Sequence, residues 1–566
     1  MKQKQIAVIG AGPGGLAAAV EIASKHPDDK VILIEEQNHV GGLAQAWLSK
    51  VPIEKGKYQG QTLYVRKELT HAVANMNKGG RIYEHLASLG VDMDSVPFTS
   101  TKKFAQLISL DKLEHKSLEV LNTWREMRQY LMTMAHSQKE EKQMKKYFKF
   151  IDSLIEERYH SPNSAKANLE EKLMPFLDKS FPKPLAFMGK GATLLYTKPT
   201  FVLNCFKTYE ELLDGFFKDF TREEDIKATL NILFGYWGLP SQKASGLFAS
   251  LVHVDYWEGG GPLAPETTSF QTLSEKIAET LTDTYNGEVL TKTKAIKVHV
   301  KDGKVSGITV KPRGKEAYDI ETECVIFAGD PKRTTLPLLE GHLPKNYVKK
   351  IKNYEMSTSL TGSYILTDLP LQEMKERLDY AANVLVSSYD ALNQDNEDNT
   401  PENFVYYVAI PTLREKAGLI QDREGNHIKD LHLVNIVESG GSYQRWKDLR
   451  KEDRQRYRKR KSAVITEMIN TTDRLLIPGL LEHIIHSDGY TPATFDRFGN
   501  PQSGAVYSFA QTPEQIIDRP SVFIPAVKGA FMGGAPILAS GVGGAIEAAK
   551  IVARAADNYL NRIKKM

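Results

Sequence analysis

The first forty residues alternate between short apolar runs and a segment of small residues. Residues 6–9 (IAVI) and 31–34 (VILI) are continuously apolar, which is typical of buried strands. The alanine-rich stretch between them has the composition of a helix. The pattern therefore predicts a strand, a helix and a second strand, which is the repeating unit of an α/β fold.

The first apolar run ends in a glycine-rich turn, and the second ends in an acidic residue. Gly10 lets the chain turn sharply, Gly12 has no β-carbon to hold a pyrophosphate off the backbone, and Gly15 lets the helix pack on the strand. The phosphates then lie at a helix N-terminus, which favours anions. Glu35 is placed to bind both ribose hydroxyls and to repel a 2′-phosphate. The expected dinucleotide-binding residues are Gly10, Gly12, Pro13, Gly14, Gly15 and Glu35.

The continuation of this motif indicates which dinucleotide is bound. Glu35 is followed by five residues and then by Gly41-Gly42, a spacing that resembles the FAD-binding signature of the glutathione-reductase-like flavoproteins, particularly the amine oxidase and phytoene desaturase branch. The resemblance implies that FAD is the cofactor and that Gly41 and Gly42 bring a second loop against its phosphates and ribityl chain. Leu43 stands where these flavoproteins usually carry Arg or Lys, at a position expected to touch the cofactor.

A hairpin pattern follows much later in the chain. Residues 287–308 read as alternating strands joined at a tight Asp302-Gly303 turn. The resemblance implies that Ala295, within this pattern, lies against the adenine. An ordinary surface hairpin is the alternative.

The last 45 or so residues contain a further segment that is expected to contact the cofactor. Residues 522–553 read as a strand, a loop that holds Gly533 and Gly534, and a helix that starts near Ser540 and Gly541. The resemblance places this segment over the ribityl chain and one edge of the isoalloxazine ring. A helix N-terminus at that edge stabilises the anionic reduced flavin.

These separate segments that are expected to contact the cofactor imply an α/β fold with a glutathione-reductase-like Rossmann FAD-binding domain that is discontinuous in sequence. Residues 1–75, 270–345 and 500–566 would build it. Residues 76–269 and 346–499 would then build a mixed α+β substrate domain, the first of them as a largely helical insertion. The apolar, aromatic-rich insertion suits a pocket for a large hydrophobic substrate, although helix cores have the same composition.

Motifs in the C-terminal third indicate which branch of these flavoproteins the chain resembles. Pro478-Gly479-Leu480, then Thr491-Pro492, then Gly504 to Tyr507 (GAVY) succeed one another as in phytoene desaturases, carotenoid cis–trans isomerases and retinol saturases. The resemblance implies an FAD-dependent oxidoreductase that desaturates, saturates or isomerises carbon–carbon bonds of an isoprenoid or polyene lipid.

The single dinucleotide motif limits the possible electron acceptors. Acid–base chemistry would need further side chains. No second Gly-x-Gly-x-x-Gly follows a strand, so we expect no second dinucleotide site. The electrons must then pass to an acceptor that diffuses to the flavin, such as O2 or a quinone, or return to the substrate. Candidate catalytic residues are His483, His486 and Asp488, before the Thr-Pro step, and Tyr507 after it. A structural role is the alternative for each.

Two other functions fit the same fold. Amine or amino-acid oxidation would need an aromatic cage and often an arginine for a carboxylate, which spacing alone does not locate. A flavin-binding protein without turnover is the non-enzymatic alternative.

Composition excludes several classes of protein. The 74 Lys and Arg against 70 Asp and Glu give a net charge of +4, too small to indicate a nucleic-acid partner. The two cysteines, Cys205 and Cys324, form no metal-binding or disulfide pattern, so we expect no metal site and a reducing, cytoplasmic location.

Contact with a membrane is expected to be peripheral at most. Residues 529–546 carry no charge but consist largely of Gly, Ala and Ser around Pro536, which indicates a loop leading into a helix and not a membrane span. The basic stretches 139–149 and 445–461 could meet anionic lipid headgroups at the inner face of the membrane. Solvated helices are the alternative.

Overall fold

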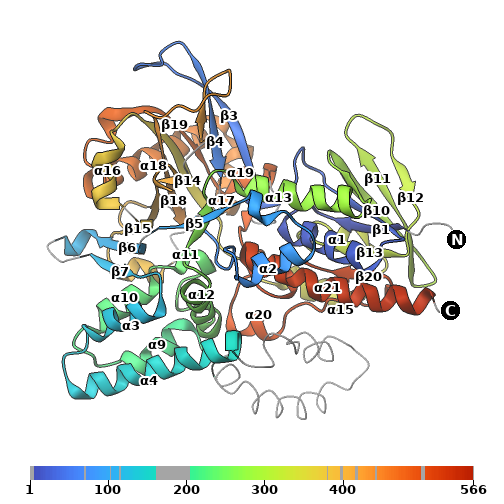
Figure 1. Cartoon of the computed structure of the whole chain (residues 1–566), viewed down its shortest axis with the longest axis horizontal. Helices are drawn as coiled ribbons and strands as arrows, with labels where there is room; N and C mark the ends of the chain where they lie inside the picture. Colours follow the sequence, from blue (N-terminus) through green and yellow to red (C-terminus); the bar gives the residue numbers. More distant parts are fainter. Residues whose placement is uncertain are drawn as a thin grey trace.

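The computed structural model describes residues 5–68, 72–101, 103–113, 117–160, 204, 206–378, 380–394, 400–414, 419–439, 443–498 and 504–564. The chain forms two parts side by side (Figure 1). The part at the right of the view holds a parallel sheet and both ends of the chain, and the other part holds a larger sheet with helices beneath it.

The parallel sheet carries the N-terminal motif. Its five described strands lie in the order β20-β13-β1-β2-β9, and β1 pairs in parallel with β13 on one side and β2 on the other. Residues 6–9 and 31–34 are fully buried within it, so the predicted pair of apolar strands is confirmed. The strands are β1 (Gln5–Ile9), β2 (Lys30–Ile34), β9 (Glu288–Leu290), β13 (Cys324–Phe327) and β20 (Ala530–Met532).

Helices α1 (Pro13–Lys25) and α21 (Gly541–Lys564) pack against each other on this sheet. The alanines of α1 are buried, and such small side chains allow the two helices to approach closely. Helix α2 (Arg81–Ser88) also contacts α21, and α13 (Phe270–Glu279) contacts α1. Residues of α2 thus share a core with the parallel sheet, whereas the exact domain boundaries stay a prediction.

A small antiparallel sheet lies beside the parallel one. It contains β10 (Thr293–Lys301), β11 (Lys304–Pro312) and β12 (Tyr318–Ile320). Asp302 and Gly303 join the first two strands with φ angles of 51° and 70°, both in the left-handed region. A tight turn with both central residues left-handed matches the twist of a hairpin, so the predicted turn is confirmed.

The second part is built on a mixed sheet. Its seven described strands lie in the order β19-β14-β18-β16-β15-β6-β7, and all neighbours are antiparallel except β15 and β6. The strands are β6 (Lys103–Ser109), β7 (Leu118–Val120), β14 (Leu360–Thr367), β15 (Tyr380–Val386), β16 (Val405–Ala409), β18 (His432–Ser439) and β19 (Ile484–Tyr490).

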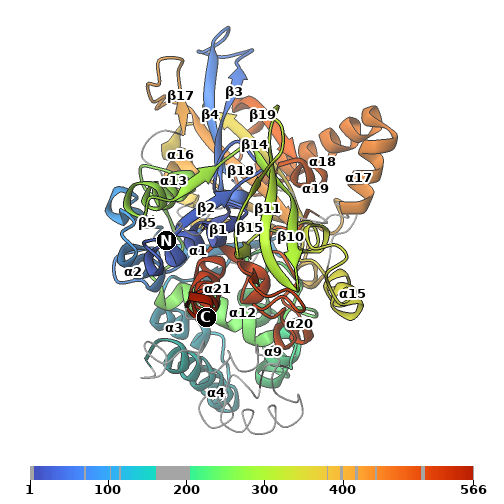
Figure 2. The ribbon, with the colours of Figure 1, turned by 90° about the vertical axis from the view of Figure 1, so that its right-hand side faces the viewer.

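Two smaller sheets complete the strands. The long hairpin of β3 (Ala46–Pro52) and β4 (Thr62–Glu68) pairs with β17 (Ile420–Gln421) and projects from the molecule in both views (Figures 1 and 2). Strands β5 (Phe98–Ser100) and β8 (Leu263–Pro265) pair with each other.

A helical layer lies below the mixed sheet. Its aromatic core includes Trp257, whose ring stacks on that of Trp124 with centroids 4.8 Å apart and on that of His253 with centroids 4.9 Å apart. Cys324 is buried in β13, and Cys205 lies outside the described residues. The helices are α3 (Trp124–Met132), α4 (Gln138–Ile155), α9 (Tyr209–Phe217), α10 (Glu223–Asn231), α11 (Phe234–Trp237) and α12 (Gly246–Glu258).

The remaining helices lie at the edges of the two parts. They are α14 (Thr335–Leu338), α15 (Lys345–Asn353), α16 (Leu371–Leu378), α17 (Tyr443–Glu452), α18 (Arg454–Leu475), α19 (Pro492–Phe498) and α20 (Pro513–Ile517). Residues 529–546 form β20, a loop and the start of α21, as predicted. Among the described helices, none combines the length and apolar character needed to cross a bilayer.

Candidate functional site

The turn after β1 brings the glycine motif against the second strand. The backbone N–H of Gly10, whose φ is 98°, donates to the carbonyl of Ile34 at 2.9 Å. A β-carbon at Gly15 would collide with the carbonyl oxygen of Gly10, so only glycine lets α1 start so close to the strand. The turn thus has the tight geometry that the motif predicted.

Two helix N-termini meet at this turn. Gly12 is the N-cap residue of α1 and Pro13 is its first residue. In the described structure no side chain caps α1, and the first turns of α1 and α21 contain no acidic residue. A β-carbon at Gly14 would lie 3.0 Å from the carbonyl oxygen of Ala545 in α21. The N-terminal turns of two helices therefore leave N–H groups available to an anion.

Glu35 lies at the carboxyl end of β2, beside the glycine turn. Its two carboxylate oxygens accept hydrogen bonds from the backbone N–H groups of Ala11 and Gln37, each at 2.8 Å. Burial raises the pKa of Glu35, and these two hydrogen bonds oppose the rise. Each oxygen keeps a lone pair, so the carboxylate can still accept from a pair of ribose hydroxyls.

The loop of the paired glycines packs on the same turn. The N–H of Gly41 donates to the carbonyl of Ala11 at 2.7 Å. A β-carbon at Gly42, whose φ is 55°, would lie 3.0 Å from the α-carbon of Gly12. The two loops therefore meet backbone to backbone, and Leu43 follows directly at the wall of a pocket.

Ala295 is two residues beyond a contact with the Glu35 backbone. The N–H of Thr293 donates to the carbonyl of Glu35 at 2.8 Å, which fixes the start of β10 next to the acidic residue. Ala295 is half-buried and pairs with Val310 in β11. Its contact with the adenine stays a prediction.

The C-terminal loop closes over the other side of the turn. The N–H of Gly533 donates to the carbonyl of Phe327, and the α-carbon of Gly534 lies 2.9 Å from where a β-carbon of Gly14 would be. Ser540 precedes α21, and its hydroxyl donates to the carbonyl of Tyr507 at 2.9 Å. Gly541 begins the helix with a φ of 83°.

These residues fit a flavin dinucleotide. Bare backbone, the N-terminal turn of α1 and one carboxylate converge where the pyrophosphate and ribose of FAD would be held. Of the expected cofactor residues, Gly10, residues 12–15, Glu35, residues 41–42 and residues 533–534 lie around one turn. Whether Leu43, Ala295, Ser540 and Gly541 touch the cofactor stays a prediction.

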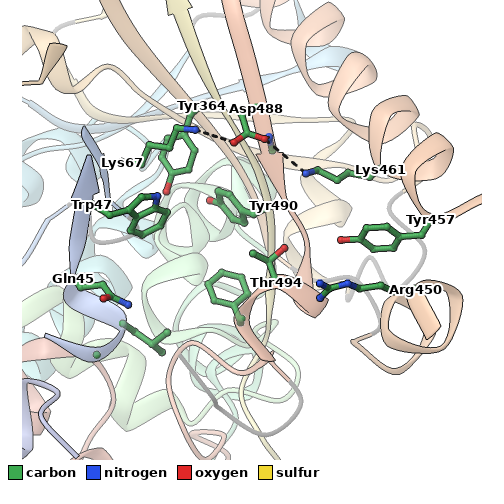
Figure 3. Close-up of a pocket in the computed structure, with 14 residues that line it drawn as sticks. Gln45, Trp47, Lys67, Tyr364, Arg450, Tyr457, Lys461, Asp488, Tyr490 and Thr494 are labelled. Carbon is green, nitrogen blue, oxygen red and sulfur yellow. Dashed lines mark hydrogen bonds and ion pairs between the residues drawn. The ribbon is translucent and has the colours of Figure 1, made fainter. Parts of the chain in front are cut away.

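A pocket of about 360 Å³ opens next to this turn, and Gly42 belongs to both (Figure 3). Aromatic rings form much of the lining, and its charged groups among the described residues are three cations and one carboxylate. The lining residues are Gly42, Leu43, Gln45, Trp47, Lys67, Tyr364, Arg450, Tyr457, Lys461, Asp488, Gly489, Tyr490, Thr494 and Phe495.

Asp488 and Lys67 form the ion pair at one side of the pocket. The ammonium of Lys67, which is 6% exposed, lies 2.8 Å from Asp488 Oδ2 and 5.6 Å from the ring centre of Tyr364. Burial alone would raise the pKa of Asp488, but the hydrogen bond from Lys67 and the charges of Lys67 and Lys461 outweigh it and lower that pKa. Asp488 therefore remains an anion in the pocket at neutral pH.

The structure separates the four catalytic candidates. Asp488 lines the pocket, whereas His483 pairs with Asp368 at 2.8 Å outside it. His486 lies on β19 opposite Leu366 and is not among the lining residues; burial and the charge of Lys67 lower its pKa. Tyr507 lies elsewhere: its ring lies next to Gly238, its carbonyl accepts from Ser540, and burial raises its pKa.

Sequence reasoning missed most of the pocket. Trp47 stands five positions after Gly42, and this proximity to the paired glycines is the signal that could have found it. Lys67, Tyr364 and Lys461 lie on different elements with no shared motif, so only the fold identifies them. In the described ranges, no three His, Cys, Asp or Glu side chains gather as a metal ion would require.

Comparison with known proteins agrees with this geometry. Residues 5–151 match a family model described as FAD dependent oxidoreductase. No curated protein sequence matches the chain.

Several solved structures share the fold over nearly the whole chain. An oxidoreductase from Methanosarcina mazei is 13% identical with a TM-score of 0.58, over 97% of this chain and 100% of its own. Wild-type putrescine oxidase bound to putrescine is 15% identical with a TM-score of 0.57, over 99% of each chain. Cyclohexylamine oxidase from Brevibacterium oxydans is 13% identical with a TM-score of 0.53, over 99% of this chain and all of its own.

The glycine turn, Glu35 and the N-terminal match together define the class of protein. The chain is an FAD-dependent oxidoreductase, and FAD is its cofactor. Its fold is the α/β fold with a Rossmann-type FAD domain that the sequence predicted, and it is similar to that of the amine oxidases among the solved structures.

Proposed function

We propose that this enzyme oxidises, reduces or isomerises a carbon–carbon bond of a hydrophobic isoprenoid or polyene substrate. The observation that carries the proposal is the aromatic pocket whose wall includes Gly42 and Leu43, next to the nucleotide turn. FAD supplies hydride acceptance or donation when it is bound. The protein then has to bind the substrate, orient it and exclude water.

A continuous row of rings supports an extended apolar substrate. Trp47 meets Tyr364 edge to face at 6.4 Å, and Tyr364 meets Tyr490 at 5.5 Å. Tyr490 in turn meets Phe495 edge to face at 5.7 Å. A row of four rings offers a long apolar wall, and the flat faces of these rings pack well against a conjugated or branched hydrocarbon.

Amine oxidation is the second candidate, favoured by the fold it shares with putrescine oxidase and cyclohexylamine oxidase. The charge of the pocket argues against it. Lys67, Arg450 and Lys461 line the pocket, and Asp488 is the carboxylate among its described lining residues. An ammonium substrate would enter a region with an excess of positive charge, which costs free energy.

Peripheral membrane contact and an acceptor such as O2 or a quinone belong to the same proposal. Trp47 is 39% exposed and Leu48 is 52% exposed on β3, beside the pocket. Helices α17 and α18 reach the other side of the pocket with Arg450 and Lys461 (Figure 3), and α18 also carries exposed basic side chains, including Arg456 and Arg458. Exposed apolar residues next to cations suit the headgroup region of a membrane from which a lipid substrate could enter. A cytoplasmic protein bound to the inner face of the membrane is the location we propose.

Anaerobic titration of the FAD-loaded enzyme tests the proposed function. We expect bleaching of the bound flavin by an extract of neutral isoprenoids or polyenes, or conversion of the polyene by the enzyme loaded with reduced flavin. Putrescine, cyclohexylamine and benzylamine serve as the comparison. Bleaching by these amines with release of hydrogen peroxide in air, and no reaction of any isoprenoid, would overturn the proposal in favour of amine oxidation.

A further inference from the structure

Two cations on neighbouring helices face the pocket from the side opposite Lys67. Arg450 lies near the end of α17 and Lys461 lies on the second turn of α18, and both point toward Asp488 and Thr494 in Figure 3. Helices α17 and α18 contact each other, and α17 also contacts α19, so the two cations are fixed relative to the pocket wall.

The charges at this end of the pocket do not balance. Oδ2 of Asp488 lies 2.8 Å from Nζ of Lys67, whereas Oδ1 lies 3.9 Å from Nζ of Lys461. Arg450 donates to the carbonyl of Ala493 at 2.9 Å and has no carboxylate partner among the described residues. Among the described lining residues, three cations stand against one carboxylate, an excess of two positive charges.

The cations also act on one another. Burial is the main cause that lowers the pKa of Lys461, and the charges of Lys67 and Arg450 lower it further against the opposing charge of Asp488. The charged form of a lysine that is 26% exposed and repelled by two neighbours is stabilised when an anion binds beside it. Arg450 adds a planar fork of N–H donors, which matches a carboxylate or a phosphate.

We propose that Arg450 and Lys461 form a subsite for an anionic group, a carboxylate or a phosphate, at one end of the otherwise apolar substrate. The subsite rests on the proposed function in that the same pocket holds the substrate. The apolar body lies along the row from Trp47 to Phe495, and the anionic end lies between the two cations. Lys67 stays with Asp488 and does not take part.

Matched probes of one chain length test the subsite on the FAD-loaded enzyme. Farnesol, farnesoic acid and farnesyl monophosphate differ only in the end group, and their binding is measured by the change in the absorption spectrum of the flavin and by calorimetry. We expect the acid or the phosphate to bind at least about tenfold more tightly than the alcohol, as for a hydrogen-bonded ion pair. The tighter of the two anions identifies the end group.

Charge-removing variants locate the effect. R450Q and K461Q are each expected to reduce the preference for the anionic probe about tenfold, because the affinity for the anionic probe falls far more than the affinity for farnesol. K459Q, at an exposed position of the same helix outside the pocket, is the control and should leave the preference unchanged. Equal binding of all three probes by the native enzyme, or equal losses in K459Q and K461Q, would overturn the subsite.

Inorganic pyrophosphate separates this proposal from the proposed function. If no farnesyl probe binds but pyrophosphate binds in a manner that R450Q and K461Q abolish, the subsite stands and the isoprenoid assignment fails. If farnesol binds and reacts while the anions gain nothing, the isoprenoid assignment stands and the subsite is wrong. If neither the probes nor pyrophosphate binds, both are wrong.

Discussion

A β-carbon on Gly42 would lie 3.0 Å from the α-carbon of Gly12, so the loop of the paired glycines rests directly on the nucleotide turn. Gly42 also lines the aromatic pocket. One residue without a side chain therefore separates the place expected for the dinucleotide from the place expected for the substrate.

This contact predicts that G42A weakens FAD binding. The added methyl would push the two loops apart and would also strain a backbone with a φ of 55°. Gly60 provides the matched control, because its φ is 82° and nothing lies within 4 Å of its β-carbon position. We expect the Kd for FAD, followed by quenching of flavin fluorescence, to rise at least about tenfold in G42A and to stay unchanged in G60A. Equal Kd values for the two variants would contradict the close contact as the cause.

The geometry at Glu35 predicts a loss that is specific for the adenosine half of the cofactor. The carboxylate is held by Ala11 and Gln37 and is placed to accept from ribose hydroxyls. E35A should therefore weaken FAD binding by roughly one to two orders of magnitude but leave binding of FMN, which has no such ribose, unchanged. The control is E36A, since Glu36 is exposed and pairs with Lys294. An equal loss for FMN would show that E35A acts by disturbing the fold.

The ion pair between Lys67 and Asp488 predicts an energetic coupling between these residues. Lys67 is nearly buried whereas Asp488 is 52% exposed, so solvent screens the pair in part and we expect a coupling of about 1 kcal/mol. A double-mutant cycle with K67M and D488N, read from urea unfolding at pH 7, measures it. The pair of Asp488 with Lys461, at 3.9 Å, serves as the comparison and should couple more weakly. Equal coupling in the two cycles would place the carboxylate midway between the lysines.

His253 predicts a loss of stability on mild acidification. Its side chain is fully buried in α12, and burial lowers its pKa to about 4, against the opposing effect of its hydrogen bond to the carbonyl of Leu230 at 2.9 Å. The unfolded chain takes up this proton at about pH 6.5 and the folded chain only near pH 4. The stabilisation is therefore complete above pH 6.5 and is lost as the pH falls toward 4, by about 2 kcal/mol at pH 5.

Unfolding by urea at pH 7.5 and pH 5.0, followed by tryptophan fluorescence, measures this loss. H253Q can still donate to the carbonyl of Leu230 but does not titrate, so the difference between the two pH values should shrink by about 2 kcal/mol. H342Q, at an exposed histidine, is the control and should leave the difference unchanged. An unchanged difference in H253Q would show that His253 takes up its proton without unfolding.

The separation of the catalytic candidates shows what sequence proximity leaves open. His483, His486 and Asp488 stand close together in the sequence, before the Thr-Pro step. Of the three, only Asp488 lines the pocket, because its lysine partners come from β4 and α18 on either side of it. The aromatic row was equally hidden, since Trp47 and Phe495 are brought together by the approach of β3, β14, β19 and α19.

The sequence alone determined the nucleotide turn, the parallel strands and the cofactor. The turn is local: Gly10, Gly15 and Glu35 act within one strand–helix–strand unit, where short-range backbone geometry dictates which residues are possible. Only the tertiary structure decided the pocket, its ring row and its excess of positive charge. Lys67, Arg450 and Lys461 meet through long-range packing of separate sheets and helices, and no local rule of spacing encodes such a meeting.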